Sequence, residues 1–369
     1  MKYLNKRIHL LIIVCVFLLT QSCSNYTALL QEAHQAYHHR NYYQAEKYFS
    51  KALKKSDSLD YGHLNTIASC YYYLNNYEKA LHFFRMIDPE KFDSVDLEKY
   101  GKTLMFFNEY EGAGLLFNRA AGKDSPGETG LKKNIYSCEW AQANRDSSAL
   151  YALSKTNFNP GGESFGIQFY RGGVVYAAPV RKRNVMKTNG KIIREKKGSV
   201  FKDLVYADFE PGALPDPKLF SKHLRSDFHT GGVCFSNSEK TIYFTETIPK
   251  DTHSVLKIFR AQLIDGKWRH KRELNFNSDN YSCAHPALSP DEAYLYFSSD
   301  MPGGYGGKDL YRCEKADSGW GSPINLGSSI NTPGDEMFPY LYRNHVLFFT
   351  SNGYVGYGGL DIFSSVYKG

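Results

Sequence analysis

The sequence lacks the short motifs that usually carry redox, metal or nucleotide chemistry. Its seven cysteines form no Cys-x-x-Cys pair, and it contains no His-Glu-x-x-His motif, no recognisable pair of catalytic carboxylates and no dinucleotide-binding glycine fingerprint. Its N-terminal apolar run, Leu10 to Leu19, is too short to span a bilayer stably. We therefore expect a protein that is not an enzyme and binds no cofactor.

Outside one segment the chain also lacks net charge. The formal charge of +7 is concentrated between residues 181 and 197. The cations there are Arg181, Lys182, Arg183, Lys187, Lys191, Arg194, Lys196 and Lys197, opposed only by Glu195. We interpret the segment as a solvated basic insertion, with contact to an anionic partner or lipid headgroup as the alternative. No base-recognition motif accompanies the segment, so we do not expect it to bind nucleic acid.

The N-terminus reads as an export signal. Three basic residues precede the apolar run, which has the length of a signal-peptide core. The run ends in "TQSC", and Cys23 after Ser22 resembles the lipidated cysteine of a bacterial lipoprotein box, although Thr20 and Gln21 depart from the usual pattern. Ordinary secretion with an incidental cysteine is the alternative.

Five cysteines remain after the signal peptide and Cys23. They are Cys70, Cys138, Cys234, Cys283 and Cys313. The number is odd and most have apolar or aromatic neighbours, so we expect small buried side chains rather than disulfides or a metal site.

Residues 26–143 repeat with a period near 34. Small residues recur at Ala45, Ala80 and Ala113, and a phenylalanine follows each of them four positions later. Small side chains at fixed offsets let antiparallel helices approach closely, while the aromatic ring fills the next repeat. The pattern resembles three tetratricopeptide repeats with a capping helix over 131–146. A simple amphipathic bundle, the alternative, would need no fixed period.

In the tetratricopeptide family the first helices of the repeats form a concave groove that docks peptides in many relatives. By the family's register this groove would contain His34, Tyr37, His38, Asn65, Ser69, Tyr72, Tyr73, Glu98, Lys102, Met105 and Phe106. The alternative is that so short an array only packs against its neighbour. The chemistry of these residues selects no ligand.

After about residue 163 the apolar pattern alternates, and Gly, Pro, Asn and Asp break it into short runs. The runs "TIYFTET" (241–247), "YLYFSSD" (294–300) and "VLFFTSN" (346–352) recur as one line of a unit of about 50 residues. The stretch "HPALSPDEAYLYF" (285–297) resembles the signature of TolB-type, WD-like blades. Four short strands per unit predict a β-propeller with about four recognisable blades. A β-sandwich would show no such repeat.

A glycine-rich phrase also recurs, as "GYGGKDLY" at 304–311 and "GYGGLDIF" at 356–363. The period is too long for calcium-binding nonapeptides, and Asp309 stands where a P-loop needs Ser or Thr. We predict turns in which glycine supplies positive φ and Asp accepts backbone N–H groups. The turn residues are Gly304, Gly306, Gly307, Asp309, Gly356, Gly358, Gly359 and Asp361. An ion held between adjacent blades is the alternative.

The stretch "GESFG" at 162–166 spells the Gly-x-Ser-x-Gly nucleophile elbow. That elbow needs a strand before the serine and a helix after it. Here a strand-like pattern follows Ser164, so we expect no catalysis from it.

The order of lipoprotein box, helical repeats and blades, with the phrases over 285–339, is similar to the OmpA-family propeller lipoproteins of Bacteroidota. Some of these are periplasmic components of the type IX secretion and gliding machinery. The resemblance implies a lipid anchor in the outer membrane and domains that bind other machine components. The family's OmpA-like domain, which grips peptidoglycan, has no counterpart before Gly369, so peptidoglycan binding is not carried over. The residues after Cys23 lack the acidic stretch of surface-exported lipoproteins, which favours the periplasmic face.

Together these patterns predict an α+β multidomain chain, an α-solenoid followed by an all-β propeller. The expected parts are a signal peptide (1–22), helical repeats with their capping helix (23–146), a linker (147–162) and a propeller whose last blade is truncated (163–369). The expected function is a non-enzymatic, outer-membrane-anchored scaffold that faces the periplasm and binds proteins of an envelope or secretion machine. The alternative is a lipoprotein whose propeller senses or binds a ligand, glycan or peptide.

Overall fold

The computed structural model describes residues 26–55, 59–123, 128–145, 164–179, 185–188, 191–194, 201–208, 217–250, 253–317 and 319–368. The chain forms two compact units. The first consists of Met1–Ser147 and Val355–Gly359, and the second of Ser148–Tyr354 and Leu360–Gly369. Cys23 and most of the basic insertion lie outside the described residues.

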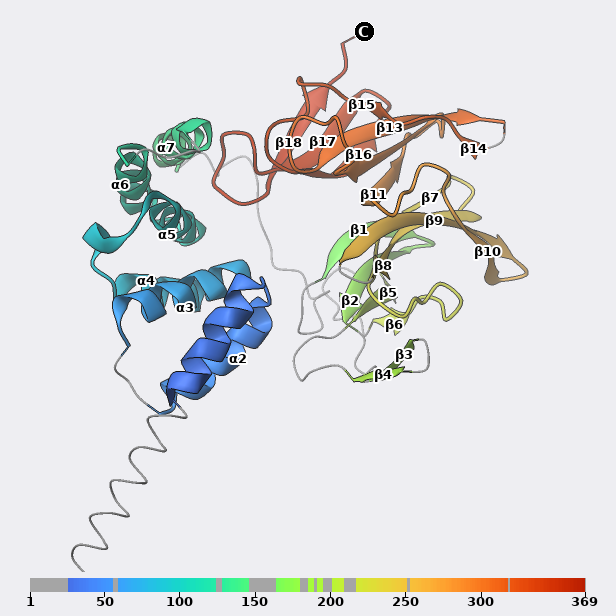
Figure 1. The fold of residues 1–369 in the computed structure, drawn as a ribbon. Coiled ribbons are helices and arrows are strands. Elements are labelled where there is room, and N and C mark those ends of the chain that lie inside the picture. Colours follow the sequence, from blue (N-terminus) through green and yellow to red (C-terminus); the bar gives the residue numbers. More distant parts are fainter. Residues whose placement is uncertain are drawn as a thin grey trace, which may run out of the picture. The chain divides into compact units, whose positions relative to one another are not determined.

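The first unit is helical. A helix over 26–38 precedes α2 (Tyr42–Leu53), α3 (Tyr61–Tyr73), α4 (Tyr77–Arg85), the short 3₁₀ turn η1 (Pro89–Lys91), α5 (Ser94–Phe106), α6 (Tyr110–Ala121) and α7 (Glu128–Ala143). The helices follow one another from blue to green in Figure 1. Asn41, Asp60, Asn76 and Asp93 accept backbone N–H groups at the starts of α2 to α5, which satisfies donors that a helix leaves free.

The repeated small residues lie in the core of this unit. Ala45, Ala80 and Ala113 are each 0% exposed, and the phenylalanines that follow them are also buried. A side chain at Gly101 would collide with the ring of Phe117, so the close helix contact there needs glycine. The predicted helical-repeat architecture is confirmed.

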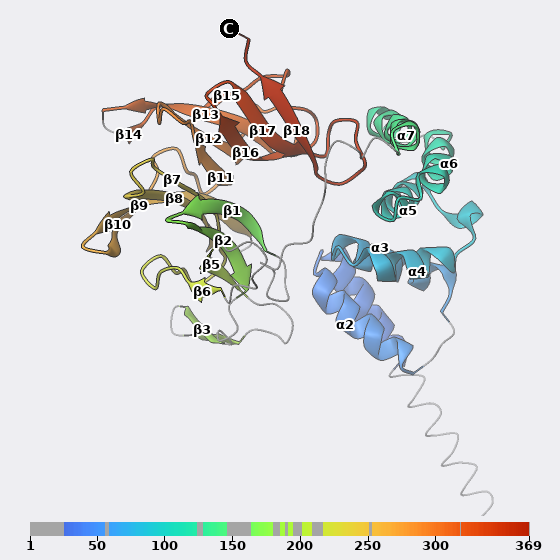
Figure 2. The same cartoon turned by 180° about the vertical axis from the view of Figure 1, so that it is seen from behind.

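The second unit contains four antiparallel sheets, which we call blades 1 to 4 in chain order. Blade 1 contains β1 (Phe165–Tyr170), β2 (Gly173–Pro179), β5 (Lys202–Asp208) and β6 (Lys218–Leu219), and blade 2 contains β7 (Thr230–Phe235), β8 (Thr241–Pro249), β9 (Ser254–Ile264) and β10 (Lys267–Glu273). Blade 3 contains β11 (Cys283–Leu288), β12 (Tyr294–Ser299), β13 (Asp309–Ala316), β14 (Gly319–Trp320) and β15 (Ile324–Asn325), and blade 4 contains β16 (Glu336–Tyr342), β17 (Val346–Ser351) and β18 (Asp361–Val366). A separate hairpin of β3 (Val185–Thr188) and β4 (Lys191–Arg194) lies within the basic insertion. The predicted propeller-type fold is confirmed, and Figure 2 shows the blades from green to red.

Apolar side chains fill the spaces between successive blades. Val175 and Leu204 of blade 1 share a core with Phe244 of blade 2, and Ile258 of blade 2 shares the next with Phe297 of blade 3. A third core joins blades 3 and 4. Strand β1 packs on β7, β7 on β11 and β11 on β16, so the innermost strands are neighbours in chain order.

The turn before β13 depends on hydrogen bonds to Asp309. Its carboxylate accepts the backbone N–H of Tyr305 at 2.6 Å and that of Gly306 at 3.2 Å, and the side-chain amide of Asn325 donates to it at 2.8 Å. The predicted reason for the glycines needs correction here. Gly303 has a positive φ of 90°, whereas Gly304, Gly306 and Gly307 do not.

Close approach explains these three glycines instead. A Cβ at Gly304 would meet the Asp309 carboxylate, one at Gly306 the carbonyl of Thr332, and one at Gly307 the Asp335 carboxylate. In the second copy of the phrase, Gly358 and Gly359 do have positive φ, 112° and 71°, as the prediction requires. Gly356 does not.

The five cysteines that follow Cys23 are buried and form no disulfide. Burial raises the pKa of the Cys70, Cys234, Cys283 and Cys313 thiols to about 12, so they remain protonated at neutral pH. Among the described residues no helix is both long and apolar enough to cross a membrane. No group of three or more His, Cys, Asp or Glu side chains in this part of the chain is arranged to hold a metal ion.

Candidate functional site

The innermost strand of every blade carries a bulge at the same place. The strand register shifts between Phe165 and Gln168 on β1, and equivalent shifts occur on β7, β11 and β16. At each bulge one residue has positive φ: Gly166, Gly232, His285 and Phe338. His285 follows Gly232 by 53 positions and precedes Phe338 by 53, so the bulge belongs to the blade repeat.

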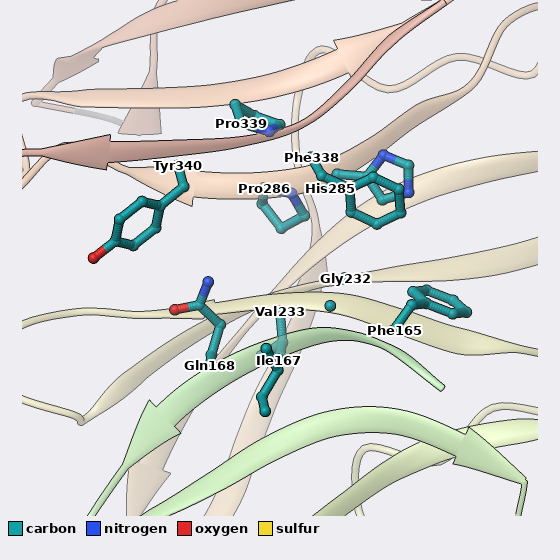
Figure 3. A pocket seen from close by; sticks show the side chains of 11 residues that line it. Phe165, Ile167, Gln168, Gly232, Val233, His285, Pro286, Phe338, Pro339 and Tyr340 are labelled. Carbon is teal, nitrogen blue, oxygen red and sulfur yellow. The ribbon is translucent and has the colours of Figure 1, made fainter. Parts of the chain in front are cut away.

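These bulges line a cavity of about 350 Å³ between the four innermost strands. Figure 3 shows Ile167 and Gln168 on one wall, with Pro286 and Tyr340 on the opposite side. The glycines of blades 1 and 2 have no side chain to occupy the space. In blades 3 and 4 the equivalent positions carry His285 and Phe338, whose rings stack with centroids 3.8 Å apart. The cavity, which we call the axial pocket, is therefore open beside blades 1 and 2.

Residue His285 is held firmly in this wall. Its backbone N–H donates to Thr245 Oγ1 at 3.0 Å, and its ring Nδ1 lies 2.9 Å from Ser298 Oγ. Burial, and after it the positive charge of Lys308, lowers the pKa of His285 to about 3. The imidazole is therefore neutral at physiological pH.

The axial pocket has an apolar and uncharged lining. Its walls include Phe165, Ile167, Val233 and Pro286, and none of the residues that line it is Asp, Glu, Lys or Arg. Gln168 and the neutral His285 are the polar side chains among them besides the hydroxyl of Tyr340. Such a pocket suits an apolar or aromatic group with a few hydrogen bonds to fix its orientation.

A second cluster of interest lies between α3 and α5 of the helical unit. Lys99 Nζ is 2.6 Å from Asp96 Oδ1 and 2.7 Å from Ser69 Oγ, and Asn65 donates to the other oxygen of Asp96 at 2.5 Å. The Lys99 and Asp96 side chains are 10% and 9% exposed. The Asn65 Oδ1 atom is buried and has no hydrogen-bond partner among the described residues. We call these four residues the α3–α5 polar cluster.

The residues predicted for the helical groove fall into separate environments. Ser69 and Met105 are buried, His38, Tyr73, Lys102 and Phe106 are exposed, and the others are half-buried. Asn65 and Ser69 meet in the polar cluster, whereas Glu98 and Lys102 pair with each other at 2.7 Å. Burial raises the pKa of Tyr37 to about 12, and burial together with nearby His63 lowers that of His34.

The repeat register did not reveal Asp96 and Lys99. They lie among the predicted Glu98 and Lys102 on α5, and their contacts with Asn65 and Ser69 depend on which face of α5 meets α3. An Asn and a Ser at aligned positions of one helix, with Asp-x-x-Lys on the next, is the pattern that could have indicated them.

The residues of the Gly-x-Ser-x-Gly phrase do not assemble an elbow. Strand β1 begins at Phe165, directly after Ser164. The Ser164 hydroxyl is buried and has no hydrogen-bond partner in the part of the chain that the structure describes. Gly162 and Glu163 lie outside the described residues.

No family model matches the chain, and no curated protein matches it. Among the solved structures that are similar to it, three match just over half of the chain. A structure described as TolB of Agrobacterium tumefaciens is 16% identical, with a TM-score of 0.31, over 53% of this chain and 62% of that one. A puromycin-hydrolysing peptidase of Mycobacterium tuberculosis is 12% identical, with a TM-score of 0.32, over 56% and 36%. A prolyl endopeptidase is 12% identical, with a TM-score of 0.27, over 55% and 25%.

The chain thus spans less than two thirds of the length of these proteins, and likenesses this distant support no argument about their activities in this chain. They do correct one expectation. The expectation that the chain is not an enzyme is withdrawn, because two of these three structures are peptidases. The comparisons assign no catalytic residue here.

Proposed function

We propose that this protein binds protein partners and that the axial pocket receives an apolar side chain of one of them. The observation that carries the proposal is the pocket itself, about 350 Å³ and uncharged, formed by the bulges of all four innermost strands. Because Ile167 is 52% exposed and lines it, the pocket opens to solvent on the blade 1 side. A single aromatic or aliphatic anchor from a partner would be desolvated there, as interface hot spots are.

The helical unit supplies a second binding element in this proposal. The α3–α5 polar cluster fixes α5 against α3 with buried hydrogen bonds. On the same two helices, Tyr73 of α3 and Phe106 of α5 expose 42% and 61% of their surface. Exposed aromatic side chains on a rigid framework are suited to peptide recognition, because little conformational entropy is lost on binding. The aromatic pair would therefore provide affinity and the polar cluster the rigidity.

The proposed setting is the periplasmic side of an outer membrane, as part of an envelope machine. Its support is the N-terminal pattern that ends at Cys23 and the likeness of the 285–339 phrases to propeller lipoproteins. Acylation of Cys23 would keep both units near the membrane surface and raise their effective concentration for membrane-bound partners.

Two matched substitutions test the pocket. Ile167→Trp adds a large side chain at a position that is already half exposed, so it should fill the pocket without unfolding β1. Ile324→Trp adds the same side chain at a 55% exposed position on β15 that does not line the pocket. Quantitative affinity capture from solubilised envelopes should lose specific partners with Ile167→Trp and retain them with Ile324→Trp. Equal capture by both variants would contradict the proposal.

The helical unit is tested in the same way. Replacing Tyr73 and Phe106 by alanine should weaken partner binding roughly tenfold or more if they are anchors. Leu115→Ala is the control, because Leu115 is 69% exposed but lies on α6, outside the predicted groove residues.

A ligand-binding function is the second candidate, and the size of the pocket favours it specifically. Small-molecule sites usually have volumes of about 300–1,000 Å³. A screen of peptides, glycans and small metabolites by thermal shift would separate the two. A small ligand that stabilises the wild type but not Ile167→Trp would support this candidate over a protein partner.

A further inference from the structure

One face of blade 4 is exposed and mostly apolar, with Thr350 and Ser364 as its polar members. Side chains along a strand alternate between the two faces of a sheet, and the register pairs Tyr340 with Phe348, and Val346 with both Tyr342 and Val366. The exposed fractions on this side are Tyr340 50%, Tyr342 44%, Phe348 38%, Ile362 77% and Val366 54%. We call these five residues the blade-4 face.

The other face of the same sheet is buried. Leu341, Leu347 and Phe349 are 8%, 8% and 3% exposed and form the core that joins blade 4 to Leu310 of blade 3. Blade 4 therefore does not depend on the blade-4 face for its attachment to the propeller.

The blade repeat shows what kind of surface the blade-4 face is. Aligning "KDLYRCE" with "LDIFSSV" places Ile362 where blade 3 has Leu310, and aligning "YLYFSSD" with "VLFFTSN" places Phe348 where it has Tyr296. In blade 3 these two side chains pack against blade 4, and Leu310 is 0% exposed. The blade-4 face is thus the type of surface that receives another sheet.

A strand that faces solvent elsewhere in this chain carries charged side chains. The outer strand β10 exposes Lys267, Arg269 and Arg272. On the blade-4 side of β16, β17 and β18, by contrast, none of the face positions carries a charge. Exposed apolar patches of this kind usually mark interaction sites.

We propose that the blade-4 face is the contact between two copies of this chain, related by a two-fold axis. Aromatic side chains of about 200 Å² each, exposed by these fractions, offer with Ile362 and Val366 roughly 500 Å² per copy. Two faces together bury about 1,000 Å², which reaches the lower limit of a specific interface. Sheets pack face to face readily at a spacing of about 10 Å.

Charge and geometry favour this occupant. In a two-fold contact each patch meets itself, so a charged patch would repel its copy, and the blade-4 face is uncharged. In a head-to-tail contact, the blade-4 face of one copy would instead pack against blade 1 of the next copy. The side of blade 1 that corresponds to the side by which blades 2 to 4 pack against the preceding blade would then have to be exposed. Val174, Tyr176 and Val205 form that side, and each is at most 2% exposed already. The blade-4 face is therefore self-complementary.

Sedimentation velocity of the full chain over a wide range of concentrations tests the proposal. A Cys23→Ser change prevents lipid from associating the copies. We expect a reversible monomer–dimer equilibrium that Ile362→Lys weakens tenfold or more. Ile324→Lys is the matched control, since Ile324 is equally apolar, 55% exposed and outside the face, and it should leave the equilibrium unchanged. Circular dichroism and thermal melting check that both variants fold.

The two-fold relation has a test of its own. Each of Ile362→Lys and Ile362→Glu alone should dimerise at least tenfold more weakly than the wild type. Their mixture should regain dimers, because a two-fold contact centred on Ile362 then brings opposite charges together. A wild-type chain that stays monomeric at every concentration, or equal effects of Ile362→Lys and Ile324→Lys, would overturn the proposal. A mixture that stays monomeric would overturn the two-fold arrangement.

Discussion

Blades 3 and 4 are built from nearly the same phrases and differ in what lies beside them. Leu310 in "KDLY" is 0% exposed, while Ile362 in "LDIF" is 77% exposed. Both strands pair with their neighbour in the same register. The difference teaches that the repeat specifies the sheet, whereas packing against a neighbouring sheet is what buries Leu310.

The largest expected effect is the loss of stability when the buried Leu310 is truncated. Leu310→Ala should destabilise the propeller by about 2–5 kcal/mol, because it leaves a cavity between blades 3 and 4. Ile362→Ala should cost well under about 1 kcal/mol in the monomer, because its side chain is mostly in solvent. Chemical denaturation at low protein concentration measures both. Equal losses would show that the Ile362 side chain is buried in the monomer.

The second effect concerns the repeated aspartate. Asp309 is 1% exposed and accepts two backbone N–H groups and the Asn325 amide. Asp309→Ala should cost about 2–3 kcal/mol, since those donors lose the buried carboxylate that they share. The same change at the half-buried Asp361 should cost less. Thermal unfolding of the two variants ranks them, and a smaller loss at Asp309 would argue against its role in the turn.

The third effect, of similar size, is a pH dependence of stability. It arises from His285 at the bulge of blade 3, where blade 4 has Phe338. Burial lowers the pKa of His285 to about 3, below its ordinary value of 6.5. As the pH falls, the unfolded chain therefore takes up the proton first. The contribution of neutral His285 to the free energy of unfolding is complete above pH 6.5 and is lost as the pH falls toward 3. Between pH 6.5 and 5 the loss should be about 2 kcal/mol.

Replacing His285 by Phe, the residue of blade 4, gives the control for that prediction. Urea unfolding of His285→Phe should show a flatter pH dependence over this interval than the wild type. An unchanged slope would mean that other groups cause the acid destabilisation.

The smallest effect concerns the ion pair between the two blades. Lys308 Nζ lies 3.4 Å from Asp335 Oδ1, and both side chains are 32% exposed. Lys308→Met should cost about 0.2–1 kcal/mol and the difference from wild type should shrink in high salt. A loss of several kcal/mol, independent of salt, would show that the pair holds the blades together.

Much of the fold could be predicted because its packing repeats along the chain. The helix contact needs a small residue once in each repeat, so Ala45, Ala80 and Ala113 were visible as a period, and all three are 0% exposed. The blade strands recur for the same reason. The envelope location stays a prediction, since Cys23 lies outside the described residues.

The candidate sites could be predicted only in part. The axial pocket depends on bulges, and a histidine and a phenylalanine with positive φ at 285 and 338 carry no sequence signal for that conformation. The polar cluster depends on which face of α5 meets α3, so Asp96 and Lys99 were missed beside Glu98 and Lys102. The exclusion of an enzyme failed for another reason, because absent motifs do not define a function.

Photocrosslinking in cells that naturally produce the protein tests protein binding at the axial pocket most directly. A photoreactive amino acid at Gln168, which lines the pocket, should give a discrete adduct with another protein, whereas the same residue at Ile324 should not. No protein adduct at position 168, or equal adducts at both positions, would contradict the account.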